Sequence, residues 1–346
     1  MKRQIRPLLS HGAAAALVAA GLLTMNPSTQ AALLAYEGFD YTPGLGLQGL
    51  NGGYQWTSPW ATATANSQVV GGNLVYQDPL GNYALSSGNS VHVTGDGVSD
   101  GLPGGLGNSS ANPFRKLADR GTSAGTTWIS FMALRTGLTT TNAYSNVNGP
   151  ANYGRATGAQ LFYNANPTST TQGNEIISFG RGTANSDPAG LANDTWGYLL
   201  RGNGALTKAS TDAWNTPANA NSTADFILVK IDHNNGVSNP MDDVMQMWIN
   251  PILSNEGLLG AATLTFNPGD FGGTAPNEER DLAFNAFRLF AGNWNTTVGN
   301  YGSMNVDEIK IGETYGDVTL LAVPEPSILA LVGIGGLALV NRLRRK

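Results

Sequence analysis

Short runs of strand-forming residues, separated by clusters of glycine, asparagine and proline, recur along most of this chain. Glycine makes up 45 of the 346 residues, and long stretches with the apolar period of a helix are missing between the two ends. The runs lie at 69–70, 73–76, 90–94, 126–134, 159–163, 175–179, 196–200, 226–232, 244–249, 263–266, 284–290 and 306–311. Strands at this spacing, without crossover helices, predict an all-β fold built as an antiparallel β-sandwich.

One of these runs also predicts its own position in the sheet. Residues 226–229 are all apolar, so a strand here presents apolar side chains to both of its faces. Such a strand is typical of the centre of a sheet that is covered on both sides. No repeat and no linker divide residues 32–321, which predicts a single domain.

The C-terminal end combines an extended segment, an apolar stretch at 328–340 and a basic end, in that order. The extended segment is Val323, Pro324, Glu325, Pro326 and Ser327, and the basic residues are Arg342, Arg344, Arg345 and Lys346. A helix over 328–340 rises only ~20 Å, so flanking residues must join it to cross the ~30 Å hydrocarbon core. We expect a transmembrane helix here, with its basic end in the cytoplasm and the body outside.

The N-terminal end has the features of a secretory signal peptide. Lys2, Arg3 and Arg6 form a cationic segment, and an apolar stretch follows at 13–23. Small residues near Ala31 suit a signal peptidase, so we expect cleavage after this residue. The domain organisation predicted is therefore a signal peptide at 1–31, a sandwich at 32–321 and a tail at 322–346.

The three-part tail resembles the PEP-CTERM sorting signal, through Pro324-Glu325-Pro326, the apolar stretch and the arginine-rich end. The resemblance implies that an exosortase, a membrane-embedded enzyme, cuts the tail at or near the motif. It also implies a membrane-anchored precursor that becomes a protein of the cell surface or extracellular matrix, associated with exopolysaccharide and biofilm. The alternative is an ordinary single-pass membrane anchor.

The charge of the body argues against nucleic acid as a partner. The full chain has 19 Lys and Arg and 24 Asp and Glu; three basic residues lie in the signal peptide, and four basic residues and one acidic residue in the tail. The remaining body carries a net charge of about −11, whereas nucleic-acid binding requires a basic patch. The chain has no cysteine, so no disulfide framework holds the body together.

Two segments of the body resemble the first and last strands of the concanavalin A-like, laminin-G-like jelly rolls. They are residues 34–41 and 305–312, and residues 49–60 resemble the Gly/Trp loop that follows the first strand in that fold. The resemblance implies that the two segments pair within one sheet and close a single domain.

Motifs for catalysis are weak, and we expect no enzymatic activity. Residues 121–125 match G-x-S-x-G, but residues 114–120 before this motif are charged and poorly strand-like. A strand at 126–134, not a helix, is predicted after the serine, which favours a turn between strands. His92, which we expect to face solvent, and His233 are too few for a zinc site. The adjacent pairs Asp242-Asp243 and Asp307-Glu308 point to opposite faces in a strand, and Asp307 is predicted to bind loop amides. A glycan-degrading hydrolase or lyase is the less favoured alternative, because it needs two carboxylates facing one cleft.

Two binding functions stay open for the body. Tryptophan rings beside glycine and asparagine can stack on sugars, which makes the chain a candidate lectin-like carbohydrate-binding module. The candidates are Trp214 and Trp294, followed by Trp56 and Trp60; the alternative is that these rings belong to the core. Oxygen ligands for calcium come from Asp232, Asn234, Asp242 and Asp243, although their spacing differs from an EF-hand and structural turn chemistry is the favoured interpretation.

Overall fold

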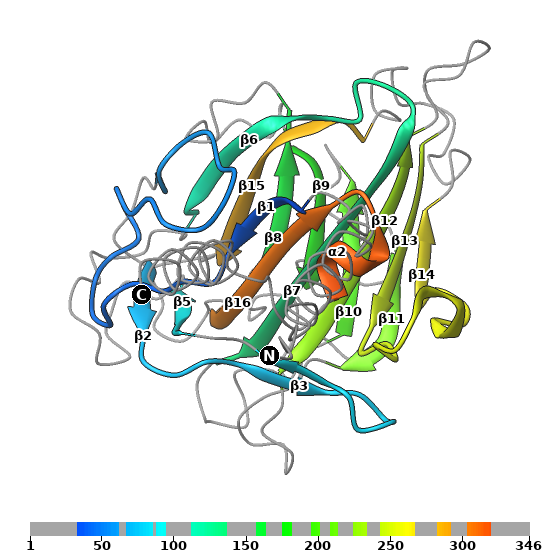
Figure 1. Ribbon diagram of the computed structural model, residues 1–346, viewed down its shortest axis with the longest axis horizontal. Coiled ribbons are helices and arrows are strands. Elements are labelled where there is room, and N and C mark those ends of the chain that lie inside the picture. Colours follow the sequence, from blue (N-terminus) through cyan, green and yellow to red (C-terminus); the bar gives the residue numbers. More distant parts are fainter. Residues whose placement is uncertain are drawn as a thin grey trace, which may run out of the picture.

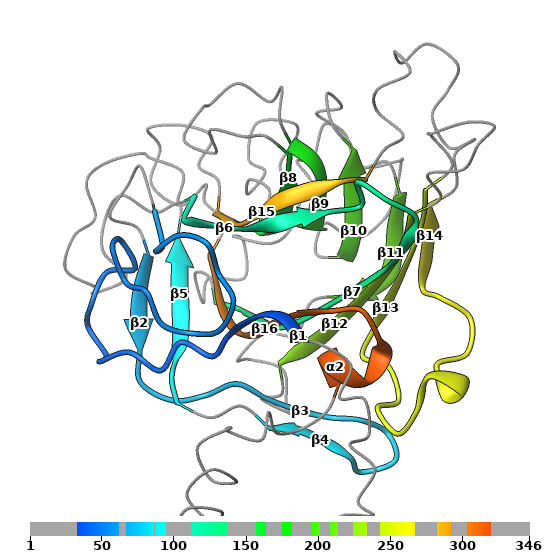
Figure 2. The ribbon, with the colours of Figure 1, turned by 45° about the horizontal axis from the view of Figure 1, so that its top comes forward.

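The protein is a sandwich of two antiparallel β-sheets, shown in Figures 1 and 2, and its coordinates come from a computed structural model. The residues that the structure describes are 33–61, 67–85, 88–94, 112–136, 157–163, 175–181, 195–200, 208–213, 224–233, 243–266, 282–291 and 303–319. The antiparallel β-sandwich predicted from the sequence is confirmed.

Sheet A has 8 strands in the order β14-β13-β12-β7-β16-β5-β2, and β1 also pairs with β16. Its strands are β1 (Leu33–Glu37), β2 (Ser67–Val70), β5 (Ser90–Thr94), β7 (Gly125–Arg135), β12 (Asp225–His233), β13 (Val244–Ile249), β14 (Leu264–Phe266) and β16 (Ser303–Gly312). The first and last strands of the body are therefore neighbours, as the resemblance to jelly rolls implied.

Sheet B has 6 strands in the order β11-β10-β9-β8-β15-β6. These are β6 (Phe114–Arg120), β8 (Thr157–Phe162), β9 (Glu175–Arg181), β10 (Thr195–Leu200), β11 (Lys208–Ala213) and β15 (Phe284–Ala291). A hairpin of β3 (Val75–Gln77) and β4 (Tyr83–Leu85) lies beneath sheet A in Figure 2. Among the described residues there are two short helices, η3 (Glu256–Leu258) and α2 (Tyr315–Thr319).

The core lies between the two sheets and is filled by alternate side chains of each strand. In β7, Ile129, Phe131 and Ala133 point inward and are fully buried. A second apolar cluster covers the outer face of sheet A, where Trp128 stacks on Trp248 at 5.9 Å between ring centroids. Because β12 contributes to both clusters, the prediction that the run 226–229 forms a doubly covered central strand is confirmed.

One strand of sheet B contradicts the sequence-based expectation. Residues 114–120 were expected to be poorly strand-like because of their charge, yet they form β6. Arg115 is the reason: its side chain is buried in an ion pair with Glu37, while Lys116 and Asp119 face solvent. A charged residue can therefore lie on the inner face of a strand when a buried side chain of opposite charge pairs with it.

Within the described ranges, no helix is long and apolar enough to cross a membrane. The predicted signal helix at 1–31 and the predicted transmembrane helix of the tail lie outside the described residues.

The β3–β4 hairpin is docked through the carboxylate of Asp78, which is 3% exposed. Its oxygens accept hydrogen bonds from the backbone of Leu80 and Asn82, from the Asn82 amide, and from the backbone of Leu253 at 2.8 Å. Burial alone raises the pKa of this carboxyl, but the bonds from Leu253, Asn82 and Leu80 outweigh it, so the pKa of Asp78 lies below its usual value. The charged carboxylate therefore stabilises the fold.

The contribution of Asp78 is expected to depend on pH. Because its pKa is lowered by folding, the contribution is present above the unfolded-state pKa of ~3.9 and is lost as the pH falls through the folded-state value. We expect Asp78→Asn to lower the free energy of unfolding by about 1–3 kcal/mol at pH 7. The deficit should shrink below pH 4, as measured by urea unfolding at both pH values. An equal deficit at the two pH values contradicts this account, and Asp119→Asn, at an exposed aspartate, is the control.

Candidate functional sites

The sorting residues predicted at the C-terminal end lie outside the described residues. They are Val323, Pro324, Glu325, Pro326, Ser327, Arg342, Arg344, Arg345 and Lys346. The same is true of Trp214 and Trp294, the first candidates for sugar binding, and of Asn234 and Asp242, two of the calcium candidates.

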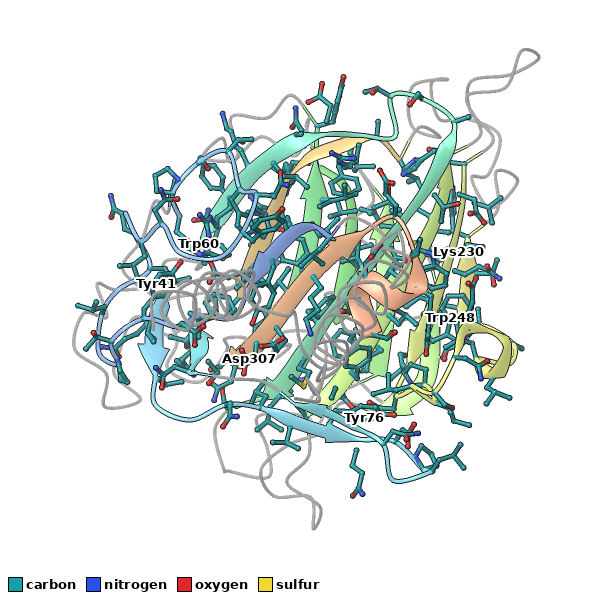
Figure 3. The ribbon with its side chains drawn as sticks, viewed as in Figure 1. Tyr41, Trp60, Tyr76, Lys230, Trp248 and Asp307 are labelled. Carbon is teal, nitrogen blue, oxygen red and sulfur yellow. The ribbon has the colours of Figure 1, made fainter. Side chains whose placement is uncertain are left out.

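Trp60 does not offer a sugar-stacking surface, so the structure corrects this candidate. Its ring is 1% exposed and lies against Phe39, with 5.8 Å between ring centroids. The indole Nε1 donates to Glu37 Oε2 at 2.8 Å. Trp56 is half-buried, and its Nε1 donates to the backbone oxygen of Tyr36 at 2.8 Å. Both tryptophans pack the 38–61 loop against the sandwich, as Figure 3 shows for Trp60.

A buried ion pair of Glu37 and Arg115 organises this loop. Arg115 Nη1 lies 2.5 Å from Glu37 Oε2, and both side chains are 1% exposed. Arg115 also donates to the Ser58 and Gly52 carbonyls and to Asn51 Oδ1, while its guanidinium lies 5.1 Å from the Trp56 ring centroid. The carboxylate and the guanidinium both bond to groups of the 38–61 loop. This arrangement is typical of residues that hold a loop in place and not of catalytic residues.

Tyr41 belongs to the same network. Its hydroxyl donates to Glu37 Oε2 at 2.9 Å and accepts the backbone N–H of Gly52 at 2.8 Å. Burial, followed by the negative charge of Glu37, raises the pKa of the Tyr41 hydroxyl above its usual value. Tyr41 therefore stays protonated and serves as a donor to Glu37.

Of the calcium candidates, Asp232 and Asp243 are described, and they do not converge. Asp232 is half-buried and bonds Thr126 Oγ1 at 2.8 Å and Lys230 Nζ at 3.3 Å. Asp243 is fully buried and accepts the backbone N–H of Leu282. Across the residues the structure describes, no three His, Asp or Glu side chains gather where they could hold a metal ion.

Asp243 instead takes part in a buried chain of hydrogen bonds. His233 Nδ1 lies 3.2 Å from Asp243 Oδ2, and His233 Nε2 lies 3.1 Å from Thr127 Oγ1. The order hydroxyl, imidazole, carboxylate resembles a nucleophilic triad, but Thr127 and His233 are each 3% exposed and lie within the paired strands β7 and β12. In the neighbouring G-x-S-x-G sequence, residues 121–124 form the turn between β6 and β7, as predicted, and Gly125 begins β7.

The side chains of His92 and Asp307 both lie on the outer face of sheet A, where they form hydrogen bonds. His92 was expected to face solvent, but it is only 7% exposed, and its Nδ1 lies 2.8 Å from Asn305 Oδ1. The polar partner on the neighbouring strand, which the alternation of Val91-His92-Val93 does not indicate, explains its burial. Asp307 accepts the backbone N–H of Leu74 at 3.0 Å and of Glu308 at 2.8 Å, so its predicted role in binding amides is confirmed.

A polar row on the outer face of sheet B was not predicted. Arg288 Nε donates to Gln160 Oε1, and Gln160 Nε2 donates to Ser178 Oγ at 2.8 Å. The guanidinium of Arg288 lies 4.2 Å from the Phe162 ring centroid. The register of β15, β8 and β9 places Arg288, Gln160 and Ser178 side by side, and only that long-range pairing could have identified the row.

A second group that was not predicted lies on the outer face of sheet A. Asp307 and Glu308 were expected to point to opposite faces, but a bulge between Asp307 and Lys310, where Glu308 has a φ of 53°, turns both side chains to this face. Glu308 Oε1 accepts the hydroxyl of Tyr36 at 2.9 Å, and Glu308 Oε2 lies 2.9 Å from Lys310 Nζ. Tyr54, 49% exposed, pairs with Tyr36 through two backbone hydrogen bonds. We name Tyr36, Tyr54, Gln55, Glu308 and Lys310 the tyrosine surface. The sequence feature that could have identified this surface is the position of Tyr36 in the first strand of the body, which was expected to pair with the last strand.

Comparison with solved structures finds similar structures whose sequence identity to this chain is low. An endo-β-1,4-glucuronan lyase from the fungus Trichoderma reesei is 13% identical with a TM-score of 0.40, over 80% of this chain and 98% of that one. An alginate lyase in complex with an alginate tetrasaccharide is 13% identical with a TM-score of 0.39, over 81% and 96%. A β-glucanase catalytic domain from Podospora anserina is 10% identical with a TM-score of 0.39, over 84% and 100%. These values carry no conclusion about the activity of this chain.

Comparison by sequence bears on the C-terminal end. No curated protein matches the chain. The family model of the PEP-CTERM protein-sorting motif matches residues 322–346. The match includes Pro324, Glu325 and Pro326, on which the resemblance was based. The chain therefore carries a PEP-CTERM protein-sorting motif at residues 322–346.

Proposed function

We propose that this chain is the precursor of an exported, non-catalytic protein of the cell surface or extracellular matrix. The PEP-CTERM motif at 322–346 carries the proposal, because it implies export, a membrane-anchored precursor and processing by an exosortase. The signal-peptide features of residues 1–31 support the same route, with signal peptidase acting first. Exopolysaccharide and biofilm are the setting that the motif favours.

The state of the buried carboxylates supports a non-catalytic body. In the part of the chain that the structure describes, each buried acidic side chain has hydrogen-bond or ion-pair partners. These residues are Glu37, Asp78, Asp225, Asp243, Asp307 and Glu308. A glycosidase needs two carboxylates facing a sugar across a cleft, whereas these groups are committed to backbone amides and neighbouring side chains.

Processing is tested by the mass of the mature C-terminus. We expect the chain produced in a bacterium with an exosortase system to end close to Pro326, because the tail is removed at or near the motif. Glu325→Ala should leave the tail in place, so that the protein still ends at Lys346 and stays in the membrane fraction. Intact-mass spectrometry of the two proteins measures the difference.

Glu313→Ala is the matched control for Glu325→Ala. Glu313 is a surface glutamate with a side chain that is 59% exposed, and its loss should leave processing unchanged. A wild-type protein that still ends at Lys346 overturns the proposed processing. The chain would then be a plain membrane-anchored sandwich.

A further inference from the structure

The tyrosine surface begins with a row of side chains that share one face of sheet A. Tyr36 in β1 pairs with Tyr54 on one side and with Lys310 of β16 on the other. Directly opposed residues in antiparallel strands point to the same face, with Cβ atoms about 5 Å apart. Tyr54, Tyr36 and Lys310 therefore stand side by side on the outer face, near the adjacent strands β1 and β16 of Figure 1.

The ring of Tyr36 lies along β1, over Gly38, and its orientation is fixed by its contacts. A Cβ built on Gly38 would lie 2.3 Å from the Tyr36 hydroxyl and 2.9 Å from its Cζ, so the ring crosses the space that Gly38 leaves open. The hydroxyl bonds Glu308, and Lys310 Nζ lies 5.8 Å from the ring centroid. The ring is half-buried and has a fixed orientation, which gives the surface a rigid floor.

The backbone around the tyrosine surface is strained. Gln55 has a φ of 60° and Glu308 a φ of 53°, both in the left-handed region that non-glycine residues rarely adopt. Gly53 brings the loop against β1, since a Cβ at this position would lie 2.2 Å from the Tyr36 carbonyl oxygen. Strained non-glycine residues persist where the surroundings hold them, and they gather at binding sites more than elsewhere.

We propose that the tyrosine surface is a binding site for the hexopyranose units of a neutral polysaccharide. An exposed tyrosine ring offers a flat apolar face for the C–H face of a sugar, at little cost in side-chain entropy. Gln55, exposed beside Tyr54, adds an amide whose oxygen can accept a sugar hydroxyl, while the buried pair of Glu308 and Lys310 holds Tyr36 in place next to it. Gln55 Nε2 already orients the Tyr54 hydroxyl at 2.9 Å.

The charges of the surface favour a neutral ligand. Glu308 and Lys310 neutralise each other at 2.9 Å, with side chains only 5% and 8% exposed. The body around them carries a net charge of about −11, which repels polyuronates at moderate salt. A protein partner of ordinary affinity needs about 800 Å² on each side, whereas the exposed apolar area here centres on one ring.

The test is affinity electrophoresis of the full chain in detergent, through native gels that contain hydroxyethyl cellulose, galactomannan or dextran, and through a gel with alginate as the anionic comparison. We expect at least one of the three neutral polysaccharides to retard the wild-type protein, and Tyr54→Ala to weaken the apparent association about tenfold, or ~1.4 kcal/mol. Tyr54→Phe keeps the ring and should bind nearly as well as the wild type. Ligand addition should also change the fluorescence of Trp56, which contacts Tyr36.

Leu258→Ala is the matched control, since Leu258 has the same 49% exposure as Tyr54 on η3. Its retardation should equal that of the wild type. No retardation by the three neutral polysaccharides, retardation only by alginate, or equal retardation of Tyr54→Ala and wild type each overturns the proposal. Circular dichroism of the variants excludes misfolding, and the readout is independent of C-terminal processing.

Discussion

Replacing Arg115 by alanine is expected to lower the free energy of unfolding by about 3–5 kcal/mol, because it leaves the buried carboxylate of Glu37 without its ion partner. The loss extends to the loop, since the guanidinium also bonds the Ser58 and Gly52 carbonyls. Urea unfolding of the full chain in detergent, followed by tryptophan fluorescence, measures the change. The signal of Trp60 should respond first, because its Nε1 donates to the same carboxylate.

A double-mutant cycle separates the ion pair from the packing around it. The single variants Glu37→Gln and Arg115→Met each remove one charge, and the double variant removes both, so we expect the double variant to be more stable than Arg115→Met alone. The matched control is Glu313→Gln, which removes the surface pair with Arg120 at 4.0 Å and should cost less than about 1 kcal/mol. Equal losses for Arg115→Ala and Glu313→Gln contradict a buried, uncompensated charge at Glu37.

Most strands could be predicted from the sequence because their alternation is local. The run 244–249 coincides with β13, and the run 90–94 coincides with β5. β6 was missed because the burial of Arg115 depends on Glu37, 78 residues earlier in the chain. A local pattern carries no information on such a partner, so the charges of residues 114–120 were interpreted as evidence against a strand.

The candidate sites were harder to predict than the strands, for the same physical reason. Composition indicated Trp60 as a sugar-stacking residue, but its neighbours Phe39 and Glu37 place it in the core. The tyrosine surface depends on the pairing of Tyr36 with Lys310, and these two residues lie near opposite ends of the body in the sequence. The sorting motif, in contrast, was predictable because its three parts are contiguous in the sequence.

Phe131 joins the two sheets, and its replacement by alanine is expected to cost about 3–5 kcal/mol. The ring is fully buried at the inner face of β7 and contacts Trp196 and Phe287 of sheet B, with centroids 6.2 Å and 6.3 Å away. Truncation leaves a cavity between the layers that rigid strands on both sides prevent from collapsing. The urea midpoint should therefore fall with the m-value unchanged.

The size of this effect distinguishes a packed core from loosely stacked sheets. Phe131→Leu keeps most of the volume, so it should cost clearly less than Phe131→Ala. Leu80→Ala, at a side chain that is 63% exposed, should change stability by less than about 0.5 kcal/mol. If Phe131→Ala and Leu80→Ala behave alike, the contact of Phe131 with Trp196 does not hold the layers together. A large loss for Phe131→Ala alone shows that the contact of this ring with Trp196 and Phe287 stabilises the packing of the two sheets.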